Sequence, residues 1–244
     1  MPAFTFDEPD AGELAAQEGE EAIEIETGAR PQASVIVMHG LGADGNDFVP
    51  VVPELGLPPE LRVRFVFPHA PMQPVTINAG MVMRAWYDVL ALDGGRGEDE
   101  AGIRASQGRI EGLIARERGR GIPAERIVLA GFSQGGAIAL QTGLRHPERL
   151  GGIVVLSAYL PLARSLAAEA SAANREVPIF MAHGSYDDLI PVARAHRSRD
   201  LLLELGFRVV WHEYAMPHSV CPEEIRDLAS WLQTTLGVPD DRQE

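Results

Sequence analysis

The clearest structural signal in this chain is Arg126-Ile-Val-Leu-Ala-Gly-Phe-Ser-Gln-Gly-Gly-Ala-Ile-Ala-Leu140. Its first half is an apolar run of strand length, and its second half has the composition of a buried helix. The chain therefore turns sharply from strand to helix at Ser133, and such a turn projects the side chain at its apex clear of the sheet. Helix and strand would collide there unless the flanking residues were small, and Gly131 and Gly135 supply that space.

Length and composition favour one domain. The chain has 244 residues, of which 45% are hydrophobic, so it can bury one substantial core. Residues 1–20 are acidic and show no hydrophobic period, which predicts a disordered N-terminal extension. We expect a single α/β domain over residues 21–238 and a short polar tail over residues 239–244.

Charge and hydropathy exclude several classes of partner. The formal net charge is -14, and residues 1–30 contain nine acids and one base. This balance argues against nucleic acid, or an anionic membrane, held by simple electrostatics. The sequence shows neither a membrane-length apolar run nor a signal-like start, so no stable membrane insertion is expected. The single cysteine, Cys221, fits a reducing compartment and predicts a cytoplasmic protein.

Strands alternate with helices along the chain. Apolar, β-branched runs predict interior strands at 33–38, 63–67, 127–130, 152–156, 177–182 and 207–214, and polar–apolar alternation predicts an edge strand at 22–26. Helices are expected at 101–118, 136–140, 161–173, 193–205 and 222–236, with a short one within 47–55. This order predicts an α/β fold in which helices cover both faces of a mostly parallel central sheet. Functional loops then gather at the carboxyl ends of the strands.

Residues 68–92 form an unusual connection. The segment is too proline-rich for a long helix and too apolar for a solvated loop, with Met72, Met83 and Trp86 among its large side chains. Two interpretations stand: a wall of a substrate site, or a surface loop packed on the core. An apolar loop beside an open site is also compatible with a homodimer.

Three side chains at strand ends fit the chemistry of a serine nucleophile. A serine hydroxyl needs a base, usually histidine, and the histidine needs a carboxylate to fix its tautomer. In hydrolases built on such a sheet the chain order is Ser, then Asp or Glu, then His. Ser133, Asp187 and His218 follow that order, each just beyond a predicted strand.

The base and the acid both have competitors. His218 is favoured because it follows the serine, leaves a late strand and precedes the last helix. Four of the other histidines stand in turns, one in a helix and one in a strand: His39, His69, His146, His183, His196 and His212. Asp187 and Asp188 are adjacent. We favour Asp187 as the acid, with Asp188 as a cap of the following turn.

Main-chain amides are suited to hold a developing oxyanion because they are fixed in advance. One is expected from Gln134, directly after the nucleophile, and one from Leu41 in the glycine-rich loop His39-Gly-Leu-Gly42. A phosphate-binding turn is the alternative for this loop. No lysine follows it and no G-x-G-x-x-G opens a helix, which disfavours that alternative.

From about residue 33 to 236 the chain resembles the phospholipase/carboxylesterase group of α/β-hydrolases, which includes the acyl-protein thioesterases. The segments that carry the resemblance are HGLGADGNDF (39–48), PHAPMQPVTIN (68–78), AWYD (85–88), GFSQGGAIAL (131–140), HGSYDDLIP (183–191) and YAMPHSVCPEEI (214–225). The resemblance implies an α/β-hydrolase fold, the same catalytic and oxyanion residues, and a substrate pocket lined by Trp86 and its neighbours Met83 and Arg84. Arg84-Ala85 stands where relatives carry proline and a small residue, which would place a cation at the pocket mouth.

These features predict a serine hydrolase without cofactor or metal. Its expected substrates are carboxylic esters with small to medium acyl groups, lysophospholipids or acyl-thioesters, cleaved through an acyl-enzyme. An acyltransferase or a peptidase would use the same triad. A binding protein without catalysis that holds an acyl ligand in the Met- and Trp-containing loop is the alternative from another class.

Overall fold

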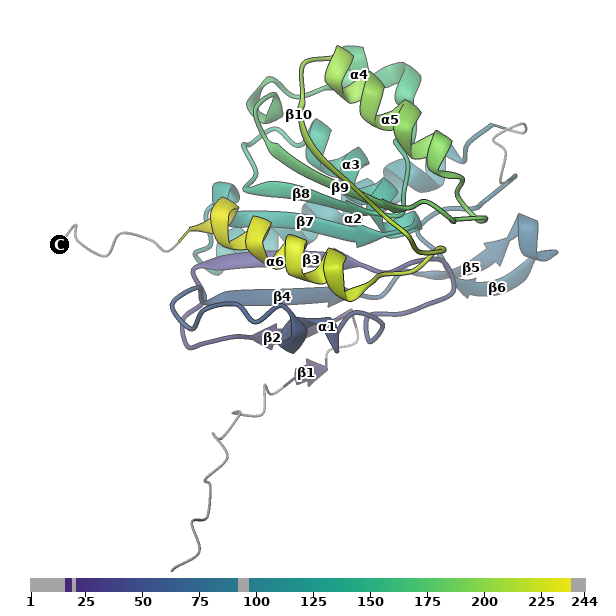
Figure 1. The fold of residues 1–244 in the computed structure, drawn as a ribbon. Coiled ribbons are helices and arrows are strands. Elements are labelled where there is room, and N and C mark those ends of the chain that lie inside the picture. Colours follow the sequence, from purple (N-terminus) through teal and green to yellow (C-terminus); the bar gives the residue numbers. More distant parts are fainter. Residues whose placement is uncertain (1–15, 19–20, 92–96, 238–244) are drawn as a thin grey trace, which may run out of the picture.

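The computed structural model describes residues 16–18, 21–91 and 97–237. At its centre is an eight-stranded sheet with the order β1-β2-β4-β3-β7-β8-β9-β10 (Figure 1). These strands are β1 (Ala16–Glu18), β2 (Ala22–Glu26), β3 (Ala33–Met38), β4 (Val63–Pro68), β7 (Ile127–Phe132), β8 (Gly152–Leu156), β9 (Pro178–Gly184) and β10 (Arg208–Tyr214). Neighbours from β4 to β10 are parallel, and only the pairs β1 with β2 and β2 with β4 are antiparallel. The predicted α/β fold with a mostly parallel sheet is confirmed.

Helices cover both faces of the sheet. On one face lie α1 (Val51–Glu54) and α6 (Pro222–Leu236), and on the other α2 (Glu100–Gly119), α3 (Gln134–Arg145), α4 (Ala163–Glu169) and α5 (Val192–Glu204). Short 3-10 turns occur at η1 (Thr76–Asn78), η2 (Ala124–Arg126) and η3 (Ala172–Asn174). The expected helices are all present, although the predicted segment 161–173 divides into α4 and η3. Within the described ranges, no helix is long and apolar enough to cross a membrane.

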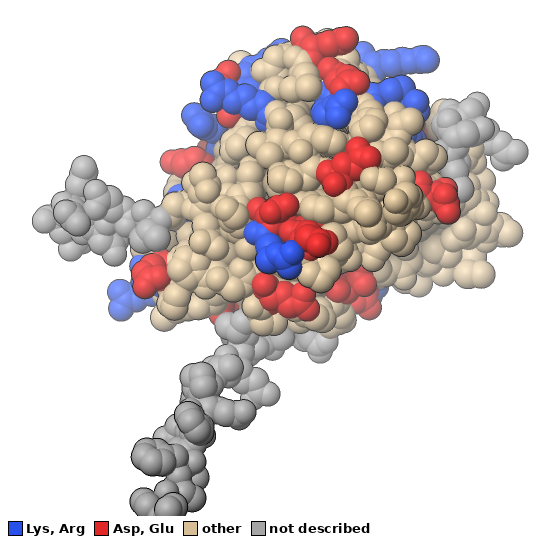
Figure 2. Space-filling view, in the orientation of Figure 1, with Lys and Arg blue, Asp and Glu red and all other residues tan. Residues whose placement is uncertain are grey.

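Charged side chains are unevenly spread over the surface. In the view of Figure 2, basic side chains gather at the top, over α4 and α5, among acidic ones, while the charged groups across the middle of the face are mostly acidic. Part of this charge is used structurally, because Glu169 on α4 bonds Arg104 on α2 at 2.7 Å and Arg145 on α3 at 2.6 Å. These two arginines lower the pKa of Glu169 to about 2. Three helices are thereby joined on one face of the sheet.

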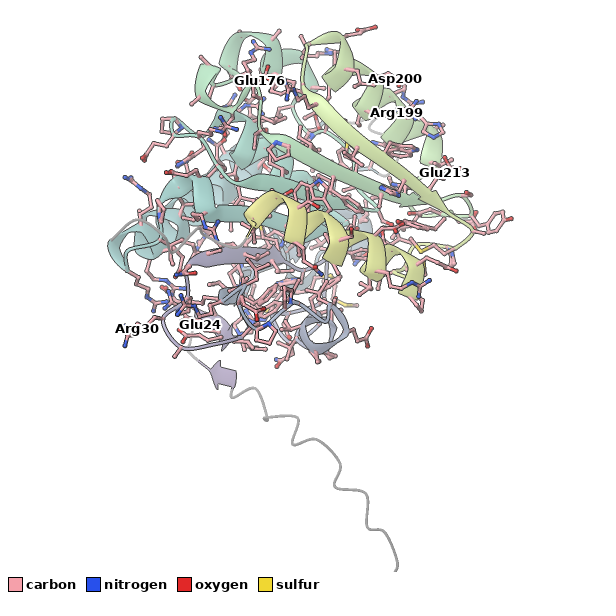
Figure 3. All side chains as sticks on the ribbon, turned by 60° about the vertical axis from the view of Figure 1, so that its left-hand side comes forward. Glu24, Arg30, Glu176, Arg199, Asp200 and Glu213 are labelled. Carbon is pink, nitrogen blue, oxygen red and sulfur yellow. The ribbon has the colours of Figure 1, made fainter. Side chains whose placement is uncertain are left out.

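The N-terminal edge differs from the sequence prediction. Ala22–Glu26 was expected at the edge, but β2 lies between β4 and β1. Residues 1–20 were expected to be disordered, yet 16–18 form β1, because antiparallel pairing uses main-chain groups whatever the side chains. Glu24 of β2, at the lower left of Figure 3, also pairs with Arg116 of α2 and with Arg120, directly after this helix, each at 2.8 Å.

Some predictions concern the two ends of the chain, which the structure describes only in part. Residues 1–15 and 19–20 and the predicted polar tail at 239–244 lie outside the described residues. The domain limits 21–238 stay a prediction.

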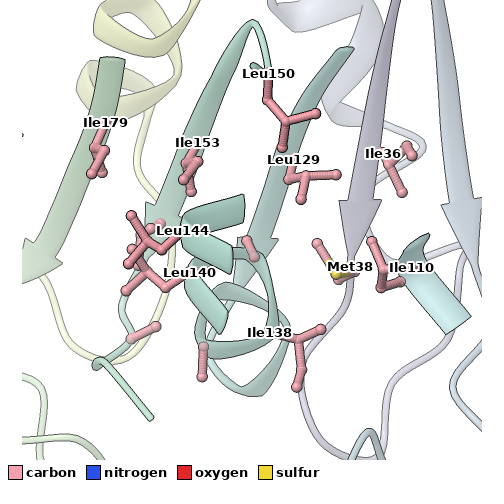
Figure 4. Close-up of a cluster of buried hydrophobic side chains, with 14 of the residues drawn as sticks. Ile36, Met38, Ile110, Leu129, Ile138, Leu140, Leu144, Leu150, Ile153 and Ile179 are labelled. Atoms are coloured by element: carbon pink, nitrogen blue, oxygen red, sulfur yellow. The ribbon is translucent and has the colours of Figure 1, made fainter. Parts of the chain in front are cut away.

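The core follows the two-residue period of the strands. Ile36 and Met38 of β3 face the cluster under α2 and α3, whereas Val35 faces the cluster under α1 and α6. Figure 4 shows side chains of α3, including Ile138 and Leu144, packed against this first set of strand residues. Each fully buried isoleucine or leucine contributes roughly 1.5–3 kcal/mol of hydrophobic stabilisation. The sheet is thus fixed between two apolar layers, with its carboxyl edge open to the connecting loops.

Residues 68–92 contain a hairpin that the sequence pattern did not predict. Strands β5 (Met72–Val75) and β6 (Met81–Arg84) pair antiparallel and project beyond the carboxyl edge of the main sheet (Figure 1). The turn between them closes through Ala79 and Gly80, which have φ angles of 55° and 77°. Pro74 is tolerated because a two-stranded ribbon has only edge strands. No hydrophobic period marks so short a ribbon, so composition alone suggested a loop.

Gly135 tests how tightly the central turn is packed. A methyl group there would collide with the carbonyl oxygen of Met38, which is main chain and has little room to move. We expect Gly135→Ala to lower the free energy of unfolding by roughly 3 kcal/mol, the upper end of ordinary overpacking. Gly112→Ala is the matched control, because Gly112 is exposed on α2 with nothing within 4 Å of the added atom. This control should gain about 0.5–1 kcal/mol from helix propensity. Urea unfolding of both variants checks the difference, and equal effects would contradict the packing account.

Candidate active site

Ser133 stands at the apex of the turn between β7 and α3. Its φ and ψ are 55° and -120°, a conformation that L-residues rarely adopt. The turn is held by a hydrogen bond from the Ser133 N–H to the Leu156 carbonyl at 2.8 Å, and by the close approach of Gly131 to Gly135. A side chain on either glycine would meet main-chain atoms, as the sequence pattern predicted. The hydroxyl group is therefore held at the carboxyl edge of the sheet.

The structure brings Ser133, His218 and Asp187 together from three loops. His218 Nε2 lies 2.9 Å from Ser133 Oγ, and His218 Nδ1 lies 2.6 Å from Asp187 Oδ2. A carboxylate can only accept, so Nδ1 donates to Asp187 and the neutral ring presents its Nε2 lone pair to the serine hydroxyl. This is the tautomer in which a histidine can take a proton from serine.

Asp187 is the member of the acidic pair that reaches His218. Its side chain is fully buried, and its Oδ1 accepts hydrogen bonds from the Leu189 and Ile190 amides at 2.9 and 2.8 Å. Its Oδ2 also lies 3.2 Å from His183 Nε2. Asp188 is exposed, and the turn-capping role expected for it belongs to Asp187. The side chains of adjacent residues in a turn point in different directions. The sequence alone therefore could not decide which of the two aspartates contacts His218.

Aromatic packing supports the His218 ring. The ring centroid of Phe132 lies 4.8 Å from that of His218 and 5.7 Å from that of Phe48. Phe132 immediately precedes Ser133. The same turn therefore positions both the Ser133 hydroxyl and the aromatic ring that packs against His218. The sequence offered no signal for this contact beyond the position of Phe132.

Of the two amides expected to hold an oxyanion, that of Gln134 directly follows Ser133, and Leu41 follows Gly40, where an added Cβ would stand 3.5 Å from Ser133 Cβ. Gln134 is the first residue of α3, where an N–H has no acceptor within the helix. Leu41 lies in the loop after β3, and the next amide in this loop, Gly42 N–H, donates to the Arg84 carbonyl at 2.9 Å. The side chain of Gln134 is bonded at both ends, since Oε1 accepts from Trp86 N and Nε2 donates to Tyr87 O, each at 2.7 Å. This fastens residues 86–87 to the start of the helix.

His39 and Trp86 fix the loop that contains Leu41. His39 Nδ1 lies 2.7 Å from the Gly40 carbonyl, so it donates there, and Nε2 accepts from the Ala70 amide at 3.0 Å. Burial lowers the pKa of His39, which keeps the ring neutral and able to accept at Nε2. Trp86 is 2% exposed and donates from its indole to the His39 carbonyl at 2.9 Å. The structure thus gives Trp86 a supporting position, and its contact with substrate stays a prediction.

Arg84 and Met83 lie on β6, next to this loop. The Met83 sulfur is 3.6 Å from where a Cβ on Gly42 would stand, so Met83 borders the Leu41 loop. Arg84 donates from Nη1 to the Ala70 carbonyl at 2.9 Å. Its guanidinium group is therefore engaged with the main chain of the Pro68–Pro71 segment, and its expected place at the mouth of a substrate pocket stays a prediction. A side chain of this length has many reachable acceptors, and the sequence does not say which it meets.

Other histidines tie the surrounding elements together. His183 Nε2 donates to the Ile190 carbonyl at 2.8 Å, and burial lowers its pKa. His196 of α5 lies 3.0 Å from Glu213, which also accepts from the Ser185 hydroxyl at 2.8 Å. Figure 3 shows Glu213 near the end of β10. The hydrogen bonds from Ser185 and His196 lower the pKa of Glu213. These contacts join the loop after β9 to α5 and β10.

Exposed apolar side chains occur on two loops at the same edge of the sheet. Met81 and Val82 of the hairpin are 64% and 59% exposed, and Leu189, two residues after Asp187, is 46% exposed. Large apolar side chains beside a reactive hydroxyl suit the binding of an acyl chain. The arrangement combines a hydroxyl, an imidazole and a carboxylate joined by hydrogen bonds with two candidate oxyanion donors and an apolar border.

The sequence profile of the family described as Phospholipase/Carboxylesterase matches residues 20–236. The chain is 43% identical over 225 residues to "Acyl-protein thioesterase 1" of Mycosarcoma maydis, a match that covers 86% of this chain and 94% of that protein. It is likewise 43% identical to "Acyl-protein thioesterase 1" of Neurospora crassa, with 88% and 92% covered.

Solved structures agree with this result. Arabidopsis thaliana SOBER1 superposes with a TM-score of 0.79 at 29% identity, covering 84% of this chain and 99% of that one. Zea mays acyl-protein thioesterase 2 superposes with a TM-score of 0.77 at 28% identity, covering 93% and 100%.

Glu224 follows His218 in the sequence by six residues. It lies in the first turn of α6 and is fully buried. Burial raises its pKa to about 8, and the main-chain N–H of Cys221 offsets only part of that rise. The acid is therefore neutral in the folded protein at pH 7, whereas it is ionised in the unfolded chain, where its pKa is near 4.5.

This raised pKa predicts a loss of stability with rising pH. Between about pH 4.5 and 8 the folded state keeps a proton that the unfolded state releases, so Glu224 lowers the free energy of unfolding progressively, by up to about 4–5 kcal/mol. Glu224→Gln should remove this dependence and be more stable than the parent at pH 9. Glu223→Gln, at an exposed neighbour, is the control and should shift stability by less than about 0.5 kcal/mol at every pH. Urea unfolding at pH 5, 7 and 9 measures the effect, and parallel pH curves for the parent and Glu224→Gln would contradict it.

Proposed function

The chain belongs to the phospholipase/carboxylesterase family of α/β-hydrolases and is an esterase- or thioesterase-type hydrolase, and we propose that it works through Ser133, His218 and Asp187. The observation that carries this proposal is the unbroken pair of hydrogen bonds from Ser133 Oγ to His218 and from His218 to Asp187, at 2.9 and 2.6 Å. No other histidine of the described chain contacts the serine in this way.

The reaction begins with attack of Ser133 Oγ on the acyl carbonyl carbon. His218 Nε2 takes the hydroxyl proton as the Oγ–C bond forms, and the carbonyl electron pair moves onto oxygen. The Leu41 and Gln134 amides donate to that oxyanion. When the C=O bond re-forms, the bond to the leaving oxygen or sulfur breaks and His218 returns the proton to it. Water then attacks the acyl-enzyme by the same path and releases the acid.

Asp187 acts through His218. Its carboxylate holds Nδ1–H in place and stabilises the positive charge that the ring gains during attack. The buried hydrogen bonds from the Leu189 and Ile190 amides fix the carboxylate itself. No step of this reaction requires a metal or an organic cofactor.

The proposed substrates are carboxylic esters and thioesters with an apolar acyl group. The exposed Met81, Val82 and Leu189 at the edge of the site support an apolar acyl chain. Relatives that are 43% identical carry the name acyl-protein thioesterase 1, which supports a thioester as one of the bonds cleaved. Lysophospholipids fit the same apolar border.

A cytoplasmic location and a homodimer are further proposals. The single Cys221 supports the cytoplasmic location, and the exposed apolar side chains of the hairpin support a homodimer that forms through it.

Removing the nucleophile tests the mechanism. Ser133→Ala should lower kcat for p-nitrophenyl butyrate by about three to six powers of ten, because the remaining groups provide only binding and oxyanion stabilisation. A fluorophosphonate probe should label the parent protein once, at Ser133, and leave the variant unlabelled. Near-parental hydrolysis by the variant would rule out Ser133 as the nucleophile.

The adjacent acids provide a matched pair for the third member. Asp187→Asn should lower kcat by roughly three to four powers of ten, because an amide favours the wrong tautomer of His218. Asp188→Asn alters an exposed side chain one residue away and should keep activity within about twofold of the parent. Steady-state kinetics of both variants decides the assignment, and the opposite ranking would transfer the role to Asp188.

A further inference from the structure

A buried histidine lies beside the proposed catalytic acid. His183 is the next-to-last residue of β9 and precedes Asp187 by four residues. It is completely buried, and this burial lowers the pKa of the ring, which keeps it neutral at pH 7. A neutral imidazole has one N–H group, so the acceptors of that proton define what the ring can stabilise.

The proton of His183 belongs on Nε2. This nitrogen lies 2.8 Å from the Ile190 carbonyl oxygen and 3.2 Å from Asp187 Oδ2, and both of these oxygens can only accept. A bare Nε2 lone pair would repel both of them. Nδ1 has no hydrogen-bond partner among the described residues, which agrees with a proton on the other nitrogen. His183 therefore directs its N–H toward the Asp187 turn.

Four N–H groups surround the buried carboxylate of Asp187. The Leu189 and Ile190 amides donate to Oδ1 at 2.9 and 2.8 Å. On the other oxygen, His218 Nδ1 lies at 2.6 Å and His183 Nε2 at 3.2 Å. His183 is thus the one side chain besides the proposed base that approaches Oδ2 with an N–H group in the described part of the chain.

Glu224 shows what burial does to a carboxyl group with fewer donors. Its side chain is as well shielded as that of Asp187, but only the Cys221 main-chain N–H offsets the effect of burial, and its pKa rises to about 8. The role proposed for Asp187 requires the ionised form. Each N–H directed at a carboxylate favours that form, so the donors around Asp187 have a chemical purpose beyond packing.

Ile190 links His183 to the carboxylate a second time. Its amide donates to Asp187 Oδ1, and its carbonyl accepts from His183 Nε2. The His183 ring therefore fixes the main chain that holds one oxygen while its N–H lies close to the other. Both contacts restrain rotation of the Asp187 side chain.

The His183 ring is itself held in place. It stacks on Trp211 of β10 with an interplanar angle of 14° and ring centroids 6.5 Å apart. The next residue, Gly184, packs so closely on the following loop that an added Cβ would stand 2.3 Å from the Met216 carbonyl oxygen and 2.5 Å from that of Pro217. The end of β9 thus lies against the loop that carries the proposed base, and the ring sits where the loops of acid and base meet.

We propose that His183 is a positioning residue of the active site, whose Nε2–H holds the Asp187 carboxylate in the orientation and the ionised form that support His218. This inference rests on the proposed function and extends the hydrogen-bonded series Ser133, His218 and Asp187 by a fourth side chain. His183 acts through Asp187 and transfers no proton to the substrate.

Two substitutions separate the N–H group from the bulk of the ring. His183→Met keeps a long apolar side chain without a donor, and it should lower kcat for p-nitrophenyl butyrate by about ten- to a hundredfold, as expected for loss of a hydrogen bond to a charged group. KM should stay within about threefold, because the ring does not touch the substrate. His183→Gln retains a neutral side-chain N–H and should recover kcat to within about threefold of the parent. Equal losses in the two variants would overturn the proposal.

A double variant shows whether the effect passes through Asp187. In the Asp187→Asn protein the carboxylate is already absent, so adding His183→Met should lower the remaining kcat by no more than about twofold. A residue that only supports the fold would cause the same further loss in either background. Losses that multiply would therefore contradict a positioning role.

His146 provides a matched control. It is also buried, it stands at the end of α3 opposite Ser133, and neither of its ring nitrogens has a hydrogen-bond partner among the described residues. His146→Met should keep kcat within about twofold of the parent, since it removes a buried ring without removing a contact to the site. Each kcat is referred to the concentration of sites titrated by a fluorophosphonate, so a partly unfolded sample does not count as a slow enzyme. A loss as large as that of His183→Met would show that burial alone explains the effect.

Nuclear magnetic resonance of protein labelled with ¹⁵N-histidine tests the contact without turnover. In the parent at pH 7, His183 should be neutral with its proton on Nε2, and the resonance of His218 Nδ1–H should move in His183→Met but stay in place in His146→Met. A proton on His183 Nδ1 in the parent would overturn the inference even if no His183 variant folds. A parent that shows these signals but neither hydrolyses esters nor is labelled at Ser133 would reject the proposed function and leave the contact. Hydrolysis with an unchanged kcat and an unmoved His218 resonance in His183→Met would reject the role of His183 alone.

Discussion

The turn at Ser133 is the constraint on which the rest of the structure depends. A residue with φ of 55° and ψ of -120° costs roughly 1–3 kcal/mol, and the protein holds it there by burying α3 almost completely against β7 and β8. Gly131 and Gly135 allow helix and strand to approach closely enough for that packing. The strain is therefore stabilised by the same core that forms the sheet, and the hydroxyl group keeps its place without support from solvent-exposed loops.

Around this turn, polar contacts set the positions of loops that have no regular structure. Gln134 is bonded to residues 86 and 87, Trp86 to His39, and His39 to Ala70, so the segments after β3, β4 and β6 are connected to the start of α3. Because these groups are buried, breaking one bond leaves its partner unsatisfied at a cost of about 1–3 kcal/mol. Such a network restrains the loop after β3, although residues 39–46 contain three glycines.

The groups proposed to carry out the reaction and those proposed to select the substrate lie on different elements. The proposed catalytic groups sit at strand ends, with Asp187 shielded from solvent and the His218 ring packed on Phe132. Side chains proposed to contact the rest of a substrate stand farther out, on the hairpin and on the loop after β9. Substitutions on these outer elements can alter specificity while the strand ends stay unchanged.

By itself, the sequence determined the strand–turn–helix unit around Ser133, the parallel sheet and the order of Ser133, Asp187 and His218, because apolar periodicity and the need for small residues beside a sharp turn are encoded in neighbouring positions. Only the tertiary structure decided that Asp187 and not Asp188 meets His218, that residues 72–84 pair as a hairpin, and that Arg84 turns toward Ala70. Such contacts join segments without a common period, and they depend on how whole loops are placed at the end of the sheet.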